Sequence, residues 1–400
     1  MRKNLMGACL ILLSFSPMKA QQIEWTKPDS LFKYVQPFAS VQLWAVYTMN
    51  EKLQMEDNGP LEDIEDRLNF LTRRARIGFK GKPYRGLSYF LNVQYDNLGK
   101  DRFGAIRGGV NTGQLGILDA YVSYKLSRNS DAFHITAGYF HPQFSRESIT
   151  GDMNVNSFDK PPLQGYVRDH ITGKSYGRTT GVNLGGNLGA GAITIGYNVS
   201  VCNNNTTGTD ATETSGRFWS PLIVDRVTFS VGDPDKKSYS LMYESNNYFN
   251  ERKGITVGIN SSRQGKTDKF DANQFAGVDV MLNYNGLNLD AEGARLMRRI
   301  EGVTYQMTTW QIRGGFNIIV AQKSIVEPMM MYMKFQGDPG ATSEGLEEMY
   351  DMGVNWYLNK KNLKLTLHYI KQSGFGDNGY TDDETFRKGD FVGLGFVSMF

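Results

Sequence analysis

A row of basic side chains in the segment LTRRARIGFKGK, residues 71–82, is the feature that most directly suggests chemistry. Its members alternate with other residues along the segment and are Arg74, Arg76, Lys80 and Lys82. In a β-strand, alternate residues share one face at intervals of about 7 Å. Cations in such a row attract anions and pass them along a water-filled path. An alternative stays open, because the same cations can pair with carboxylates on neighbouring strands and only stiffen the wall.

Long β-strands are the elements that would position this row. From Tyr34 to Phe400, apolar residues alternate with polar or small residues, and turn residues break the pattern. The clearest stretches are 87–96, 118–125, 193–200, 308–317, 350–358 and 363–369. These strands run to about ten residues, longer than most strands of soluble sheets. Aromatic residues near the ends of the apolar faces are typical of strands that cross a membrane.

The connections between these strands alternate between short and long. Short ones include 81–86, 127–131, 187–189 and 359–362, and long ones include 50–66, 99–113, 142–177, 203–221 and 371–387. Short periplasmic turns and long external loops are typical of outer-membrane barrels, whose strand number is even. About seventeen candidate strands are counted, so one strand is missed or wrongly included. The region from Cys202 to Lys253 is where this error is expected, because the alternation of short and long connections fails there. The sequence therefore predicts an all-β fold, a transmembrane antiparallel β-barrel of about 16 (or 18) strands.

In such a barrel the two faces of the basic segment meet different surroundings. Its apolar face, formed by Leu71, Ala75, Ile77 and Phe79, is expected to meet lipid. The basic face, on which Thr72 also lies, then points into the lumen. Arg73 interrupts the apolar face and is expected to reach the extracellular interface.

The first twenty residues have the pattern of a signal peptide. Arg2 and Lys3 precede an apolar stretch from Leu5 to Phe15, and Ala20 is a plausible cleavage point. We expect residues 1–20 to be the signal peptide, 21–33 a short periplasmic segment and 34–400 the barrel domain. The chain ends on a strand with a terminal aromatic, Phe400, as outer-membrane barrels do. The expected location is the outer membrane of a Gram-negative bacterium.

Composition narrows the possible partners. The chain of 400 residues has 44 basic and 41 acidic residues, but Arg2, Lys3 and Lys19 lie in the signal peptide, so 44 − 3 = 41 basic residues balance the 41 acidic ones. Any preference for anions must therefore come from where charges lie. Beyond the N-terminus, no apolar run reaches the roughly 20 residues of a spanning helix. Of the two cysteines, Cys9 lies in the signal peptide, so the mature chain keeps only Cys202 and forms no internal disulfide. Nothing indicates nucleic-acid binding or a cofactor.

Three segments carry a resemblance to a known family. LTRRARIGFKG (71–81), HITAGYFHPQFSRES (134–148) and GRTTGVNLGG (177–186), in this order behind a signal peptide, resemble the phosphate-selective porin O/P family. The resemblance implies a barrel porin, typically a sixteen-stranded homotrimer, whose long third external loop folds inward and narrows the pore. Residues 142–177 would be that constriction loop.

Charged residues on the lumen face and in this loop are the site candidates. The pore-lining candidates for anion binding are Arg74, Arg76, Lys80, Lys82 and Arg313, and the constriction-loop candidates are Arg146, Arg168, Lys174 and Arg178. The loop contains one more cation, Lys160, and four acids: Glu147, Asp152, Asp159 and Asp169. The mixed charges predict a water-filled channel for passive diffusion of small hydrophilic solutes, with a modest preference for anions such as phosphate.

Two other classes of protein remain as alternatives. A structural or adhesive barrel with a plugged lumen would share the strand pattern but would not conduct ions. An outer-membrane enzyme would need a nucleophile, a base and an orienting group together. The four histidines, which lie in no recognisable nucleophile or metal-ligand pattern, are His134, His141, His170 and His368. We therefore expect a channel, not an enzyme.

Overall fold

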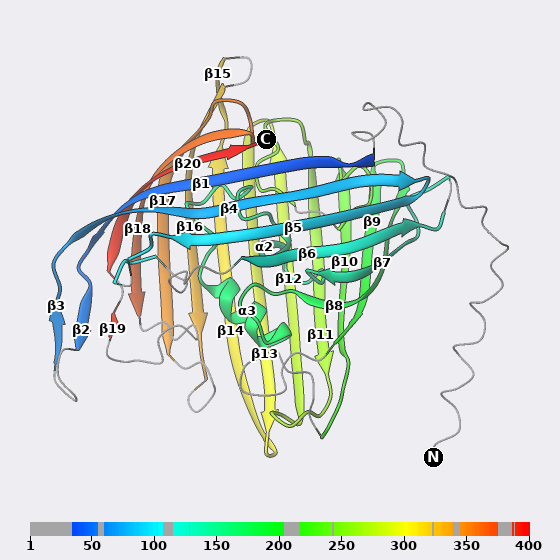
Figure 1. Ribbon diagram of the computed structural model, residues 1–400, viewed down its shortest axis with the longest axis horizontal. Coiled ribbons are helices and arrows are strands. Elements are labelled where there is room, and N and C mark those ends of the chain that lie inside the picture. Colours follow the sequence, from blue (N-terminus) through cyan, green and yellow to red (C-terminus); the bar gives the residue numbers. More distant parts are fainter. Residues whose placement is uncertain are drawn as a thin grey trace.

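One antiparallel sheet closes on itself into a barrel. The computed structural model describes residues 34–54, 60–101, 103–106, 115–127, 129–203, 217–241, 244–321, 324–338, 345–374, 386–387 and 389–400. The sheet has 17 strands, of which β14 (Val303–Phe316) and β15 (Ile318–Ala321) both pair with β16 (Ser324–Gln336) and share one position. The barrel therefore has 16 strands, which confirms the predicted fold and the lower strand number (Figure 1).

The strands follow one another around the barrel in chain order. The others are β1 (Gln36–Met49), β4 (Arg67–Tyr84), β5 (Leu87–Leu98), β6 (Gly116–Lys125), β7 (His134–Phe140), β8 (Thr179–Ala190), β9 (Ile193–Cys202), β10 (Leu222–Gly232), β11 (Gly254–Gln264), β12 (Ala272–Tyr284), β13 (Leu287–Ile300), β17 (Leu346–Tyr357), β18 (Leu363–Gly374) and β20 (Asp390–Met399). Strand β1 pairs with both β4 and β20 and closes the ring, with Ser40 opposite Met399. A small outlying sheet contains β2 (Lys52–Gln54), β3 (Leu61–Asp63) and β19 (Phe386–Arg387).

Alternation along each strand separates the two faces of the wall. On β12, Val278 is 51% exposed on the outside, whereas its neighbour Asp279 is 1% exposed on the inside. Because the outward residues are apolar and the inward ones polar, the wall can stand in lipid and face water within. None of the helices in the described part of the chain is long and apolar enough to cross a membrane.

Two connections depart from the short–long rhythm. The turn between β13 and β14, Glu301–Gly302, is short although it lies on the long-loop side. The connection 233–253 between β10 and β11 is long although it lies on the short-turn side. The rhythm thus fails between Cys202 and Lys253 because this connection has an unusual length, and β10 supplies the strand that the barrel needs there.

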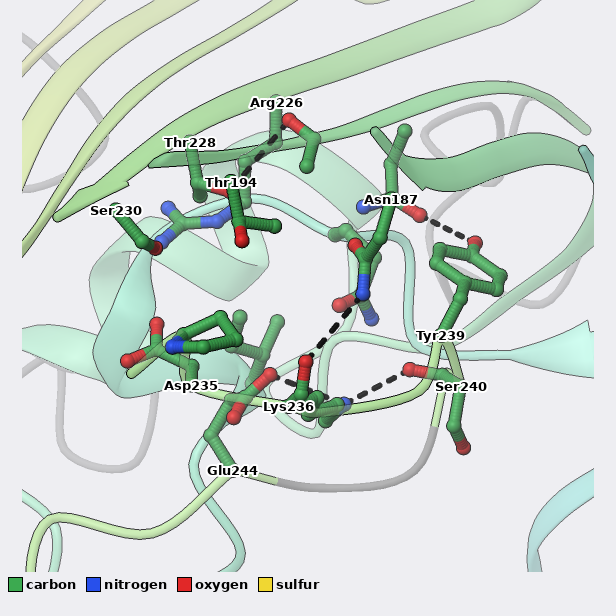
Figure 2. A pocket seen from close by; sticks show the side chains of 15 residues that line it. Asn187, Thr194, Arg226, Thr228, Ser230, Asp235, Lys236, Tyr239, Ser240 and Glu244 are labelled. Atoms are coloured by element: carbon green, nitrogen blue, oxygen red, sulfur yellow. Dashed lines mark hydrogen bonds and ion pairs between the residues drawn. The ribbon is translucent and has the colours of Figure 1, made fainter. Parts of the chain in front are cut away.

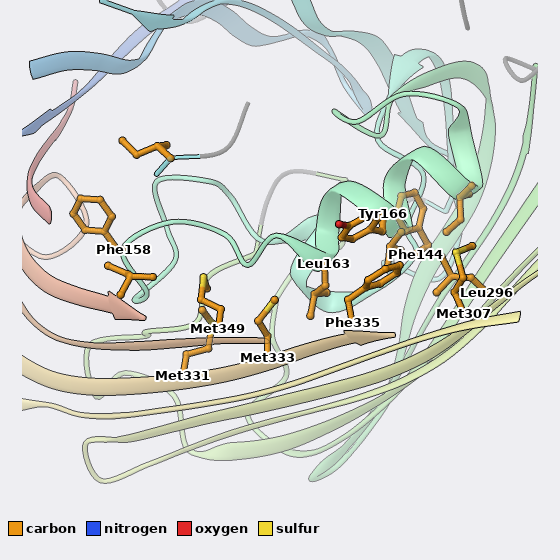
Figure 3. Packing of buried hydrophobic residues seen from close by; sticks show 14 of the residues in the cluster. Phe144, Phe158, Leu163, Tyr166, Leu296, Met307, Met331, Met333, Phe335 and Met349 are labelled. Atoms are coloured by element: carbon orange, nitrogen blue, oxygen red, sulfur yellow. The ribbon is translucent and has the colours of Figure 1, made fainter. Parts of the chain in front are cut away.

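Much of the barrel interior is filled by the connection 141–178. It carries α2 (Arg146–Ile149) and α3 (Leu163–Thr172) and lies inside the ring of strands (Figure 1). Its apolar side packs on the lumen face of β13, β14, β16 and β17 (Figure 3). The ring of Tyr166 stacks on Phe335 of β16, with centroids 3.8 Å apart and planes within 7°. Three buried methionines extend this apolar contact surface along β16: Met329, Met331 and Met333.

A β-bulge in β4 changes which residues of the basic segment face inward. Opposite β1, Gln42 pairs with Arg74 but Leu43 pairs with Thr72, so Arg73 is an extra residue. Before the bulge, Leu71 is only 5% exposed and belongs to the interior core. The expectation that Leu71 meets lipid was therefore wrong, because the extra residue shifts the alternation by one position.

Candidate functional site

Two cavities lie along the wall formed by β4, β5 and β6: the outer one faces the inward-folded connection 141–178, and the inner one faces residues 238–241 of the connection 233–253. The outer cavity, of about 250 Å³, contains Arg74 and Arg76 in its lining. The inner cavity, of about 660 Å³, lies toward the short-turn side and contains Lys80 and Lys82. Four residues of extended strand, about 13 Å, separate Arg76 from Lys80. The predicted basic row thus runs from one cavity to the other.

Positive charges outnumber negative ones in the lining of the outer cavity. Its six basic residues are Arg73, Arg74, Arg76, Lys160, Arg168 and Arg178, and its three acidic residues are Asp96, Asp152 and Asp159. Arg76 donates to Asp96 at 3.0 Å and to Asp152 at 2.6 Å. Arg74 donates to Asp159 at 2.7 Å and to Gln42 at 2.6 Å. The carboxylates are therefore shared among several cations, which leaves a positive excess.

Arg73 belongs to this cavity and not to the extracellular interface. Its guanidinium donates to Asp159 at 2.8 Å and to Asn97 at 2.6 Å. The bulge turns the side chain inward, so the expectation that Arg73 snorkels toward the interface was wrong. Sequence alternation alone gives no signal for such an extra residue.

Lys160 is a constriction-loop cation in an unusual setting. Its Nζ donates to the carbonyls of Glu147 at 2.6 Å and Ser148 at 3.1 Å and lies 3.4 Å from Asp152. Burial, helped by nearby Arg168, lowers the pKa of Lys160 to about 7. Burial opposes the charge of Asp152, yet Arg76 and Lys160 hold the pKa of this carboxyl well below its ordinary value.

The other predicted loop cations lie in three different settings. Arg168 and Arg178 line the outer cavity, and Arg178 contacts Asp119 on β6 at 3.4 Å. The ammonium of Lys174 lies over the rings of Tyr139 and Tyr176, at 5.8 and 5.7 Å from their centroids. Arg146 is 1% exposed, and its guanidinium donates to Asp279 on β12 at 3.1 Å and to Asp235. Arg146 therefore fastens α2 to the wall.

Arg313 on β14 has the same fastening role. It is 1% exposed and donates to both oxygens of Asp290, at 3.0 and 2.9 Å, to Ser157 at 2.8 Å and to Glu147 of α2. Because its guanidinium is covered by the loop, Arg313 lies outside the lining of both cavities, although the sequence placed it among the pore-lining candidates.

Lys80 and Lys82 differ from the arginines of the same row. Both line the inner cavity, Lys80 half-buried and Lys82 exposed. Neither side chain makes an ion pair or a hydrogen bond with any residue in the described part of the chain. Lys125, the third lysine of this cavity, contacts Asp131 at 2.5 Å. The two interpretations of the basic row therefore apply to different parts of it: the arginines are paired, and these two lysines face the cavity.

Acidic residues on the opposite wall are covered by the loop. Four carboxylates on the lumen faces of β12, β13 and β17 are between 1% and 5% exposed: Asp279, Asp290, Glu292 and Asp351. Three of them accept hydrogen bonds from the loop, as from Ser145 to Glu292 at 2.7 Å, whereas Asp290 accepts from Arg313 of β14. The acids of this wall are thus buried, whereas cations outnumber acids in the lining of both cavities.

The connection 233–253 is the part of the site that sequence reasoning missed. Figure 2 shows Asp235, Lys236, Tyr239 and Glu244 of this connection facing residues of β8, β9 and β10 across a cavity of about 60 Å³. Asp235 accepts from Arg146, and the backbone of Glu244 bonds to Ile149 at 3.0 Å and to Gly151 at 3.1 Å. The connection therefore holds the constriction loop from the short-turn side. The failure of the loop rhythm was the only sequence signal for it.

Two of the four histidines, His141 and His368, are buried among structural contacts. His368 contacts Asp351 at 2.5 Å, and its ring lies 5.8 Å from that of Phe158. Burial, with Arg178 and Arg168 nearby, holds the pKa of His141 well below its ordinary value. Among the described residues, no cluster of three or more His, Cys, Asp or Glu could hold a metal ion.

Comparisons with known proteins agree with this geometry. The family model described as phosphate-selective porin O and P matches residues 49–400. Among solved structures, OprB of Pseudomonas putida in its high-pH structure is 8% identical, with a TM-score of 0.61, over 93% of this chain and 96% of that one. An anion-selective porin from Comamonas acidovorans is 12% identical, with a TM-score of 0.54, over 92% and 99%.

A third similar structure is described as a trimer. The trimer form of in-vitro folded OmpT from Vibrio cholerae is 10% identical, with a TM-score of 0.51, over 92% of this chain and 99% of that one. No curated protein matches the sequence. At these identities the solved structures show the fold alone, whereas the family match spans nearly the whole chain. The chain belongs to the phosphate-selective porin O and P family and is an outer-membrane channel for small solutes.

Proposed function

We propose that this channel conducts small hydrophilic solutes by passive diffusion between the inward-folded loop and the β4–β6 wall, with a modest preference for anions. One observation carries the proposal: the outer cavity is lined by six cations against three carboxylates. The inner cavity continues the excess, with three lysines against Asp131. In a narrow, partly desolvated passage such an excess raises the local concentration of anions.

Phosphate is one anion that this lining suits. Arginine presents a planar fork of donors that matches phosphate oxygens, and lysine adds a compact charge. Because Arg74 and Arg76 already donate to carboxylates, a passing anion competes with Asp152 and Asp159 for the same donors. We therefore expect the anion to bind only briefly and to leave quickly, and the channel to prefer anions only modestly.

Three further features belong to the same proposal. Residues 1–20 act as a cleaved signal peptide for export to a Gram-negative outer membrane, and 21–33 form a short periplasmic segment before the barrel. These residues lie outside the part that the structure describes. The channel assembles as a homotrimer, which the family resemblance suggests and the trimer form of Vibrio cholerae OmpT makes reasonable for this fold.

Reversal potentials in a KCl gradient across planar bilayers test the proposal. The wild-type channel should favour chloride, and K80Q/K82Q should lose part of that preference because both lysines lack a carboxylate partner among the described residues. A matched control, K334Q/K371Q, removes two cations from the outward face and should leave the reversal potential unchanged. Preference for potassium in the wild type would contradict the proposal, and absence of conductance would favour the structural or adhesive barrel.

A further inference from the structure

Two aromatic rings line the inner cavity, on a barrel face that is usually polar. Phe90 on β5 and Tyr121 on β6 are paired residues in the register and point into the lumen, with ring centroids 5.5 Å apart. Phe38 on β1 stacks on Phe90, with centroids 5.3 Å apart and planes within 7°. Porin lumens are lined mainly by polar residues. The two rings of the cavity lining, with Phe38 stacked on Phe90, are therefore a specific feature of this wall.

A cation stands in the same cross-strand row as these rings. Lys80 lies opposite Phe90 in the β4–β5 register, and Phe90 lies opposite Tyr121 in the β5–β6 register. Such neighbours have Cβ atoms about 5 Å apart. Lys80 has no carboxylate within ion-pair distance among the described residues, and Lys82 lines the same cavity. The wall thus places a ring surface beside an available ammonium group.

The connection 233–253 supplies the opposite side of the cavity. Tyr239 and Leu241 line it, and the Tyr239 ring lies 4.7 Å from the ring of His134. The Tyr239 hydroxyl donates to Asn198 at 2.6 Å and accepts from Asn183 at 2.8 Å, which fixes the side chain. With about 660 Å³ between these sides, the cavity has the size of a small-molecule pocket.

We propose that the inner cavity is a binding subsite for aromatic carboxylates, with the ring of the solute against Phe90 and Tyr121 and its carboxylate toward Lys80 and Lys82. The inference rests on the proposed function and deepens it by naming a class of solute. An inorganic anion or a short aliphatic acid gains only the lysines, whereas an aromatic acid also gains ring contacts. Such contacts correspond to a roughly tenfold gain in affinity.

Block of single-channel current by benzoate and by acetate tests the subsite. In KCl, the half-blocking concentration of benzoate on the wild-type channel should be about tenfold lower than that of acetate. Equal half-blocking concentrations would overturn the inference. This comparison needs no variant, so it stands even if a substitution in the wall prevents folding.

A substitution then locates the subsite. Tyr121→Leu should raise the half-blocking concentration of benzoate by about threefold or more, because it removes one ring contact, and should leave acetate block unchanged. The matched control, Phe229→Leu, removes a ring from the lipid-facing side of β10 and should change neither value. Unchanged benzoate block in Tyr121→Leu would overturn the placement on this wall.

The reversal potential of the same channels separates the two proposals. Lack of chloride preference over potassium would defeat the proposed anion preference. Clear chloride preference without discrimination between benzoate and acetate would defeat only the aromatic subsite.

Discussion

Arg73 and Arg74 are adjacent in the sequence, yet both guanidinium groups donate to the carboxylate of Asp159, at 2.8 and 2.7 Å. Adjacent residues of a regular strand point to opposite faces. The bulge opposite Gln42 and Leu43 removes that opposition and brings two cations to one acid. Asp159 belongs to the inward-folded loop, so this contact joins the loop to the basic wall beside the outer cavity.

Asp159→Asn should increase the anion preference of the channel. The substitution removes one of three carboxylates from the outer cavity while all six cations remain. We expect the chloride-to-potassium permeability ratio, measured from reversal potentials, to rise by roughly twofold. Asp63→Asn, in the outlying sheet, is the control and should leave the ratio unchanged. An unchanged or lower ratio in Asp159→Asn would show that this carboxylate does not oppose anions.

Anion preference should also fall as pH rises through about 7. Burial and Arg168 lower the pKa of Lys160 from 10.5 to about 7, so its ammonium group loses its proton in this range. The pKa values of Asp152 and Glu147, which face it, are lowered by neighbouring cations, so both carboxylates stay charged. Reversal potentials recorded between pH 6 and pH 9 should show one cation lost from the lining.

Lys160→Met is the control for this pH dependence, because its side chain is neutral throughout. The variant should show a flat profile near the high-pH value of the wild type, and a profile that still titrates would exclude Lys160 as the cause.

The lowered pKa of Lys160 also makes the stability of the protein depend on pH. The unfolded chain holds this proton up to about 10.5, whereas the folded chain releases it near 7, so the contribution of Lys160 to the free energy of unfolding rises between these values.

Periodicity predicted the wall of this protein better than its interior. Alternation, loop lengths and the terminal Phe400 were enough for a barrel, since lipid outside and water inside impose a two-residue period. The same assumption misplaced Leu71, because a bulge inserts one residue without changing composition. It also gave no signal for Met331 and Met333, which face inward because the loop supplies an apolar partner there.

The candidate site was predicted as a set of residues but not as a geometry. Lys80 and Lys82 line a cavity as expected, and Arg74 and Arg76 do so while paired. Arg313 is covered by the loop, which depends on contacts between residues more than 150 positions apart, such as that with Ser157. Such contacts follow from how the loop packs, and strand alternation contains no information about them.

Arg313→Gln should loosen the constriction. The guanidinium lies between Glu147 of α2 and Asp290 of β13, so its removal leaves two buried carboxylates uncompensated. Breaking such a buried pair costs about 3–5 kcal/mol. We expect a higher single-channel conductance with larger current fluctuations, together with unfolding at a lower temperature in detergent. Lys334→Gln, which removes a partly exposed pair with Glu348 at 3.6 Å, should change neither quantity. Wild-type conductance in Arg313→Gln would show that this contact does not hold the loop.

The stacked pair Tyr166 and Phe335 should hold the loop through apolar contact more than through the tyrosine hydroxyl. Tyr166→Ala removes a ring stacked at 3.8 Å and leaves a void over β16, whereas Tyr166→Phe keeps the ring and removes the hydroxyl that donates to Glu347 at 3.1 Å. Truncation of a buried aromatic costs about 3–5 kcal/mol, and loss of one hydrogen bond costs about 1 kcal/mol. We therefore expect Tyr166→Ala to raise the single-channel conductance and to enlarge the current fluctuations. Tyr166→Phe should keep the conductance near the wild-type value. Equal effects of the two variants would assign the anchoring to the hydroxyl instead of the ring.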